Sequence, residues 1–442
     1  MQPHKYLPVS ETEFNQEISE LGLKQINDLF KSIPEGLRGD TTTTLAPPMS
    51  EVEIRNHFEH ETRIAKHTFV GGNGHTHYIP SIISPLVSRG EFLTAYTPYQ
   101  PEVSQGTLQA MYEFQSMMAG LMGVEISNAS LYDGSTAMLE ACYMAQRITG
   151  KNGMLFSQLI HPEYIETMKT YSKAGIFTYD FIEHTDKGRI DEAKLTARLA
   201  ENTGALIIQS PNFAGIIEDI AALKKILEPK GILLIVVVTE AMSFGLLKSP
   251  GALGADIVCG EAQSLGVPLS FGGPWLGFLG ASPNFVRNMP GRLIGEAKDA
   301  NGSRCFVVTL ATREQHIRRE KATSNICTNQ GLMALRCAIY LSVMGKTGLR
   351  RAAERCAKFA SLGRKLAGEL KGYRVRFAAS PIFNEFILET PGNADAIFQK
   401  SVREFGIAPG LPIEEKALHV SFHEMHSPEI LHKWITALQA AG

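Results

Sequence analysis

Residues 231–240 read GILLIVVVTE, and the seven residues from Ile232 to Val238 are all apolar. A continuous apolar run of this length is typical of a strand in a parallel sheet that is covered on both faces. Ala205–Gln209 is a second run of this kind, and candidate helices alternate with candidate strands around the two. The alternation predicts an α/β domain with a mostly parallel central sheet. The expected strands are 154–157, 176–181, 205–209, 232–238, 256–259 and 275–279, and the expected helices are 105–122, 162–174, 191–201 and 219–227.

The pattern changes after Thr312 and predicts a smaller α+β C-terminal domain. Helices are expected at 328–344, 348–370, 394–405 and 428–440, and strands at 374–378, 384–388 and 418–422. We therefore expect a helical N-terminal segment over 1–70, a large domain over 71–320 and a small domain over 321–442. The long Gly-, Pro- and Tyr-rich stretch over 71–104 is expected to be a functional loop.

Composition excludes several classes of function. The chain of 442 residues has a formal net charge of −2 and no long basic run, so nucleic acid is not an expected partner. The longest strongly apolar run, Ile232–Val238, is too short to cross a bilayer, and the first residues lack the apolar core of a signal peptide. The six cysteines form no CxxC motif, which is typical of a chain in a reducing compartment without structural zinc. We expect a cytoplasmic protein without a metal or membrane partner.

Two motifs have both a structural and a functional interpretation. Residues 128–141 read NASLYDGSTAMLEA, in which a turn opens an apolar helix at Asp133, Gly134, Ser135 and Thr136. Such a turn binds a phosphate at the helix start, or it is a plain N-cap. Residues 312–330 read TREQHIRREKATSNICTNQ, which is either a solvated helix face or a site for a carboxylate, a phosphate or an acidic partner.

Histidines occur in pairs, such as His75 and His77 in the 71–104 stretch. A metal site needs three or four ligands that converge, so each pair alone is more typical of packing or surface histidines. His75 and His77 are the most interesting of these because of their place in the long stretch.

Four segments together resemble the P-protein family of the glycine cleavage system: TAYTPYQPEVSQGTLQAMYEFQ (94–115), ASLYDGSTAMLEA (129–141), GEAQSLGVPLSFGGPWLGF (260–278) and REQHIRREKATSNICTNQ (313–330). Within this family, glycine dehydrogenase (decarboxylating), the chain looks like the first subunit of the two-subunit bacterial form. The similarity runs from about residue 71 to about residue 348. It implies the aspartate-aminotransferase-like fold (fold type I) of pyridoxal-phosphate (PLP)-dependent transferases. It also implies decarboxylation of glycine, with transfer of the aminomethyl group to the lipoyl group of H-protein.

The resemblance further implies that the second subunit holds PLP and that this chain is its catalytically silent homologue. The loop CGEAQSLGVPLSFGGP (259–274) has Gln263 and Ser264 where the active subunits have His-Lys, so Ser264 is at the lysine position. Lys248 is the only lysine from Gly231 to Ala297. Glu240 follows the strand after which such enzymes place an acid for the pyridine nitrogen.

The resemblance implies a heteromer, with two copies of each subunit, in which this chain completes the pocket of its partner. Tyrosines at the interface orient glycine or the cofactor, or they only pack there, where tyrosine is enriched. The expected contributors are Tyr96, Thr97, Tyr99, Gln100 and Ser104. A second set is expected to bind the carboxylate of glycine or acidic groups of H-protein: Arg318, Arg319, Lys321, Ser324 and Asn325. Two other functions stay open, a self-sufficient PLP enzyme with an unconventional lysine and a non-catalytic scaffold or regulatory relative.

Overall fold

The computed structural model describes residues 9–39, 46–61, 65–72 and 74–442, and the chain divides into two compact units, Met1–Arg63 and Ile64–Gly442. The first unit contains α1 (Glu11–Glu20) and α2 (Glu51–Glu61) with two short 3-10 helices between them. Ser10 starts α1 with a capping box, in which its hydroxyl oxygen accepts from the backbone N–H of Glu13 and the Glu13 side chain bonds back to Ser10.

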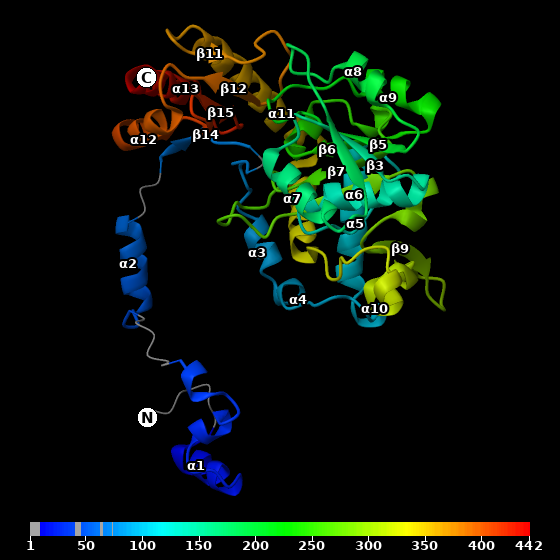
Figure 1. Ribbon diagram of the computed structural model, residues 1–442, viewed down its shortest axis with the longest axis vertical. Helices are drawn as coiled ribbons and strands as arrows, with labels where there is room; N and C mark the ends of the chain where they lie inside the picture. Colours follow the sequence, from blue (N-terminus) through cyan, green and yellow to red (C-terminus); the bar gives the residue numbers. More distant parts are fainter. Residues whose placement is uncertain (1–8, 40–45, 62–64, 73) are drawn as a thin grey trace. The chain divides into compact units, whose positions relative to one another are not determined.

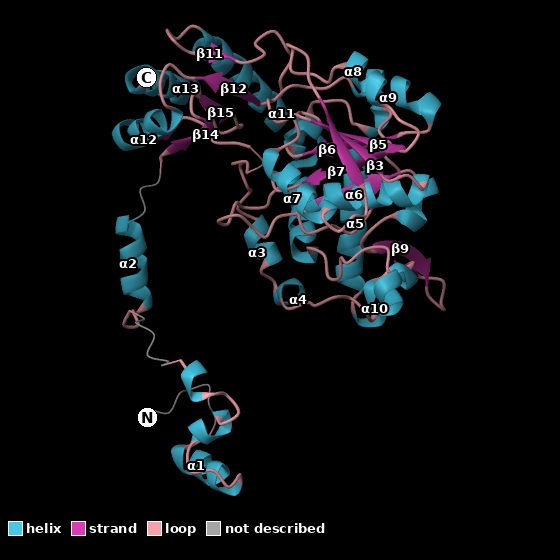
Figure 2. Ribbon diagram, viewed as in Figure 1, coloured by secondary structure: helices cyan, strands magenta, loops and turns pink. Residues whose placement is uncertain are grey.

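The second unit is built on a seven-stranded sheet with the order β2-β8-β7-β6-β5-β3-β4 (Figures 1 and 2). The five strands from β7 to β4 run parallel, and β8 and β2 at one edge are joined by antiparallel pairing. The predicted mostly parallel sheet is therefore confirmed. Its strands are β2 (Ile126–Ser127), β3 (Gly153–Ser157), β4 (Thr178–Ile182), β5 (Thr203–Gln209), β6 (Leu233–Val238), β7 (Ile257–Glu261) and β8 (Gly277–Ala281).

Helices cover both faces of this sheet, which is why its central strands are apolar throughout. Leu234 and Val236 of β6 pack with α5 (Gln105–Met122), α9 (Ile220–Leu227) and α11 (Gly331–Gly368). Ile235 and Val237 point to the opposite face, as alternate residues of a strand do. They pack with α6 (Gly134–Thr149) and α7 (Pro162–Ser172). The short helix α8 (Glu192–Arg198) contributes Leu195 to the α5 side.

The C-terminal part contains a separate four-stranded antiparallel sheet with the order β11-β12-β15-β14. Its strands are β11 (Arg374–Val375), β12 (Glu385–Glu389), β14 (Leu411–Glu414) and β15 (Ala417–Ser421), and its helices are α12 (Ala394–Phe405) and α13 (Pro428–Ala441). A two-stranded pair, β1 (His67–Thr68) with β13 (Ile407–Ala408), ties the start of the second unit to this part. The boundary expected between residues 320 and 321 stays a prediction.

The long helix α11 connects the two sheets. The predicted break between two helices is confirmed at Gly345, which has a left-handed φ of 58° inside the element. By length and composition alone α11 would suffice to cross a membrane. However, Tyr340 and Cys356 of this helix are buried in the same core as the central strands, so α11 is packed as a core helix.

A β-hairpin formed by β9 (Leu293–Lys298) and β10 (Arg304–Thr309) is absent from the sequence-based expectation. Two glutamines of α5 fix the position of the hairpin. Each of them bonds both the backbone N–H and the backbone carbonyl of one hairpin residue. The Gln115 carboxamide bonds the N–H and the carbonyl of Ile294, and the Gln105 carboxamide does the same with Phe306. The expected long loop at 71–104 also contains two short helices, α3 (Ile83–Val87) and α4 (Gly90–Leu93). The hairpin fixes Arg292, the residue that precedes β9.

Candidate functional site

The candidate site lies at the carboxyl ends of β6 and β7, where ligands bind in open α/β sheets. Glu240 follows β6 after one residue, Glu261 ends β7, and Gln263 and Ser264 follow it. The segment 74–80 comes from the start of the second unit and crosses this end of the sheet, because the backbone of His75 bonds the side chain of Gln263.

The lysine-position loop is held in shape without a lysine. The Gln263 side chain accepts from the His75 N–H at 2.9 Å and donates to the carbonyls of His75 and Val267 at 3.0 and 2.8 Å. Ser264 is buried, and its hydroxyl oxygen accepts from the Met242 N–H at 3.2 Å. Lys248 is exposed and therefore does not point into this pocket. Three buried hydrogen bonds of the Gln263 side chain thus hold the loop in place.

Glu240 is fully buried and is surrounded by two histidines and an asparagine. Its Oε2 lies 3.1 Å from His75 Nδ1, 3.0 Å from His77 Nε2 and 3.3 Å from the Asn384 side-chain nitrogen, which donates to it. Burial by itself raises the pKa of Glu240, but His75 and His77 outweigh burial and hold the pKa well below its usual range. Glu240 is therefore a buried carboxylate whose charge the protein itself compensates.

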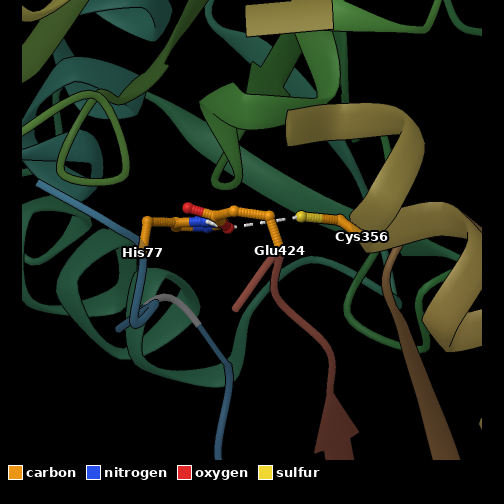
Figure 3. Close-up of side chains that lie close together, drawn as sticks. All are labelled: His77, Cys356 and Glu424. Atoms are coloured by element: carbon orange, nitrogen blue, oxygen red, sulfur yellow. Dashed lines mark hydrogen bonds and ion pairs between the residues drawn. The ribbon is translucent and has the colours of Figure 1, made fainter. Parts of the chain in front are cut away.

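His77 bridges two carboxylates. Its Nδ1 lies 2.7 Å from Glu424 Oε2, while its Nε2 faces Glu240. Burial opposes the charged ring, yet the attraction of Glu240, together with hydrogen bonds to both carboxylates and to Cys356, raises the pKa of His77 well above its usual value. Cys356 of α11 donates its thiol to Glu424 at 3.6 Å, so three distant segments meet here (Figure 3).

His77, Cys356 and Glu424 have ligand atoms within 4.8 Å of one another, so they could hold a metal ion. Two features favour an ion pair instead. The 2.7 Å separation between His77 Nδ1 and Glu424 Oε2 is shorter than the roughly 3.3 Å expected of two ligands in a tetrahedral zinc site. Burial also raises the pKa of the Cys356 thiol to about 11, which favours the protonated form.

The turn at 133–136 is occupied by carboxylates of the chain itself. Asp133 Oδ1 accepts from the Thr136 N–H at 2.9 Å and from the Ser135 hydroxyl at 2.7 Å, which is an N-cap. Glu261 Oε2 accepts from the Gly134 N–H at 3.0 Å. Its other oxygen accepts from the N–H groups of Gln263 and Leu276 at 2.9 and 2.8 Å. Burial raises the pKa of Glu261 to about 7.

These residues do not fit PLP. Ser264, which stands where the family resemblance places the lysine, is a serine that accepts from Met242, and the helix start expected to bind the phosphate already donates to two acidic side chains. A phosphate at Gly134 would have to displace Glu261 or lie against it, and like charges at close distance repel.

Only part of the expected interface set lines a cavity. Tyr96 and Thr97 line a cavity of about 200 Å³ together with Arg292, whereas Gln100 and Ser104 do not line it. Tyr99 lies beside the cavity, with its ring centroid 5.4 Å from Arg292 Cζ. Tyr96 and Tyr99 are 77% and 51% exposed, which is high for large aromatic residues.

The structure does not bring the second expected set together as one site. Arg318, Arg319 and Lys321 are exposed around a short helix, α10 (Gln315–Arg318), and the turn that follows it. Ser324 donates to Glu140 at 2.8 Å and lines a different cavity with Asn325, one of about 560 Å³.

Four polar residues of these sites were missed, or given no role, at the level of sequence. His75 and His77 could have been found by their place in the long stretch at 71–104, but their partners are more than 150 residues away. Glu261 lies in the quoted stretch 260–278 but was given no role, and Arg292 belongs to no motif.

Comparisons with known proteins match one family over nearly the whole chain. The family model described as glycine cleavage system P-protein matches residues 4–438. A protein of Koribacter versatilis named probable glycine dehydrogenase (decarboxylating) subunit 1 is 45% identical over 416 residues, which is 93% of each chain. A protein of Prosthecochloris aestuarii with the same name is also 45% identical, over 85% of this chain and 86% of its own.

Similar solved structures support the same family and fold. The crystal structure of glycine decarboxylase (P-protein) of the glycine cleavage system, in inhibitor-bound form, has a TM-score of 0.88 and 38% identity and covers 99% of this chain and 100% of its own. A sphingosine-1-phosphate lyase from Burkholderia pseudomallei shares only 16% identity with a TM-score of 0.65, over 92% of this chain and 93% of its own, and so shows the fold alone. The predicted fold type I of PLP-dependent transferases is confirmed. The chain belongs to the P-protein family of the glycine cleavage system.

Proposed function

We propose that this chain is the first of two homologous subunits of glycine dehydrogenase (decarboxylating) and that it works without a cofactor of its own. Relatives that are 45% identical over most of their length carry the name of subunit 1 of this enzyme. The observation that carries the proposal is the filled lysine-position pocket, in which Ser264, Gln263 and Glu261 take hydrogen bonds that would otherwise be open to a ligand. PLP then belongs to the partner subunit, in a heteromer with two copies of each chain.

The exposed tyrosines support a role at the partner's active site. A chain that works alone rarely leaves several large aromatic residues exposed on one segment, whereas aromatic residues are common at interfaces. When bound by the partner, PLP supplies the electron sink for decarboxylation. Tyr96 and Tyr99 would orient glycine and exclude water from the closed pocket.

The exposed basic residues support a docking role rather than a buried carboxylate site. In the described part of the chain, Arg318, Arg319 and Lys321 have no ion-pair partner, although the nearby Glu314 pairs with Arg292. We assign these three cations to acidic groups on lipoylated H-protein. The compartment we propose is the cytoplasm, because the six cysteines are all free thiols.

Reconstitution tests the proposed function. The purified chain, the second subunit and H-protein should together exchange the carboxyl group of glycine with labelled bicarbonate, and the two subunits should elute as one complex. Leaving out either subunit should abolish the exchange. Full exchange by the second subunit without this chain would contradict the proposal, and so would exchange by this chain alone.

Replacing either exposed tyrosine should slow the reaction. For Tyr96→Phe and Tyr99→Phe, we expect the exchange rate to fall by about fivefold or more, because one lost hydrogen bond is worth about 1 kcal/mol or more in a closed site. Tyr179→Phe is the matched control, since this partly exposed tyrosine lies on β4 and does not line the cavity. Unchanged exchange in both variants, with the heteromer intact by gel filtration, would leave these tyrosines a packing role only.

Reversing the exposed charges should weaken the interaction with H-protein. We expect Arg318→Glu and Lys321→Glu to raise the KM for H-protein, and the difference from wild type to shrink as salt increases, because exposed charges are screened. Lys371→Glu, an exposed lysine outside this segment, should change little. A rise in KM that is independent of salt would argue against electrostatic docking.

A further inference from the structure

Arg292 is a buried arginine whose hydrogen bonds are incomplete. Its side chain is 3% exposed, and its Nε lies 3.3 Å from Glu314 Oε2. Within the described part of the chain, its Nη1 and Nη2 atoms have no hydrogen-bond partner. A buried donor without an acceptor destabilises a protein, and more so when the group is charged. Arg292 therefore has one face held by Glu314 and a second face that lacks an acceptor.

Arg292 lies against a cavity with a defined lining. Arg292 is the one charged residue among those that line the cavity of about 200 Å³. The other lining residues include Tyr96, Thr97 and Asn329, with Leu332 on the apolar side. The Tyr99 ring lies 5.4 Å from Arg292 Cζ, within range of a cation–π contact that restricts the guanidinium. The lining suits a small ligand with one anionic end.

The start of α11 is a second, independent feature that favours an anion at the same place. Gly331 and Leu332, the first residues of this helix, line the cavity. The residue before them, Gln330, makes no side-chain capping bond. The first N–H groups of a helix carry partial positive charge and need acceptors. A carboxylate in the cavity would therefore be attracted both by the guanidinium of Arg292 and by the N-terminus of α11.

We propose that this cavity binds the carboxylate of glycine, with Nη1 and Nη2 of Arg292 donating to its two oxygens. This inference rests on the proposed function and names the residue of this chain that recognises the substrate. The fork of a guanidinium matches a carboxylate in a way that a lysine does not. The cavity also selects against amino acids with long side chains, because little of its volume of about 200 Å³ remains once the carboxylate is bound.

Kinetics of the assembled heteromer test the site. Arg292→Gln should raise the KM for glycine by about tenfold to 100-fold, because a charged hydrogen bond is worth about 1.5–3 kcal/mol, while kcat changes much less. Arg292→Lys keeps the charge beside Glu314 but loses the fork, so its KM should be intermediate. The inhibition constant of acetate, a carboxylate without an amino group, should rise in parallel with KM.

Arg304→Gln is the matched control. Arg304 also pairs with a glutamate, Glu296, and also stacks over an aromatic ring, Phe306, but it does not line the cavity. Its replacement should leave the KM for glycine unchanged. An unchanged KM in both Arg292 variants would overturn the inference. Weaker subunit assembly with an unchanged KM would also overturn it, since Arg292 would then meet an acidic group of the partner subunit.

A second measurement separates this inference from the proposed function. The full chain is titrated against ¹³C-labelled acetate, and the carboxyl line is followed by NMR without any need for activity. We expect broadening with wild type and with Arg304→Gln but not with Arg292→Gln. If the heteromer shows no exchange at all, the proposed function is wrong, and glycine is no longer the expected ligand of the cavity. Absence of broadening with wild type, in an active heteromer whose variants keep their KM, would remove the carboxylate site alone.

Discussion

The buried carboxylate of Glu240 is the constraint on which the rest of the site depends. An isolated charge at this depth would be strongly unfavourable, so the fold must supply partners from several distant segments. His75 and His77 come from the segment before α3, and Asn384 comes from the residue before β12. His77 then continues the network to Glu424, after β15. One charge thereby connects the central sheet, the small sheet and the segment that crosses between them.

The same principle applies to the loop after β7, where polar side chains of the chain itself satisfy buried backbone groups. In the filled pocket, Gln263 fixes the loop through backbone contacts, and Glu261 accepts the N–H group of Gly134 at the start of α6. These side chains satisfy the N–H groups of His75 and Gly134 from within the chain. The proposed contribution of this chain lies elsewhere, at the cavity that the exposed Tyr96 and the buried Arg292 line together.

Much of the fold could be predicted because its signals are local. The apolar runs of β5 and β6 identify buried strands, and the bounds of α5 and α12 agree with the periodicity of their sequences. The hairpin β9–β10 was missed, since Leu293–Lys298 mixes apolar and charged residues and depends on Gln105 and Gln115 of α5 for its position. The helical break in α11 was also predicted, between 344 and 348, and it lies at Gly345.

The site was less predictable, because its groups are far apart in the sequence. The loop at Ser264, the turn at Asp133 and the acid at Glu240 could be recognised from the sequence, but the role of Glu261 could not. Glu261 contacts Gly134, which is 127 residues away, and His77 contacts Glu424, which is 347 residues away. Arg292 has no motif, and its importance follows from burial and from donors without acceptors, which only three-dimensional structure reveals.

The central claim is that PLP is held by the partner and not by this chain. The most direct measurement treats the purified heteromer with borohydride, which fixes PLP covalently to its lysine, and then maps the labelled peptide by mass spectrometry. The account predicts that the label lies on the second subunit alone, and that this chain remains unlabelled both in the complex and when it is incubated with PLP by itself. A labelled lysine in this chain, whether Lys248 or another, would contradict it.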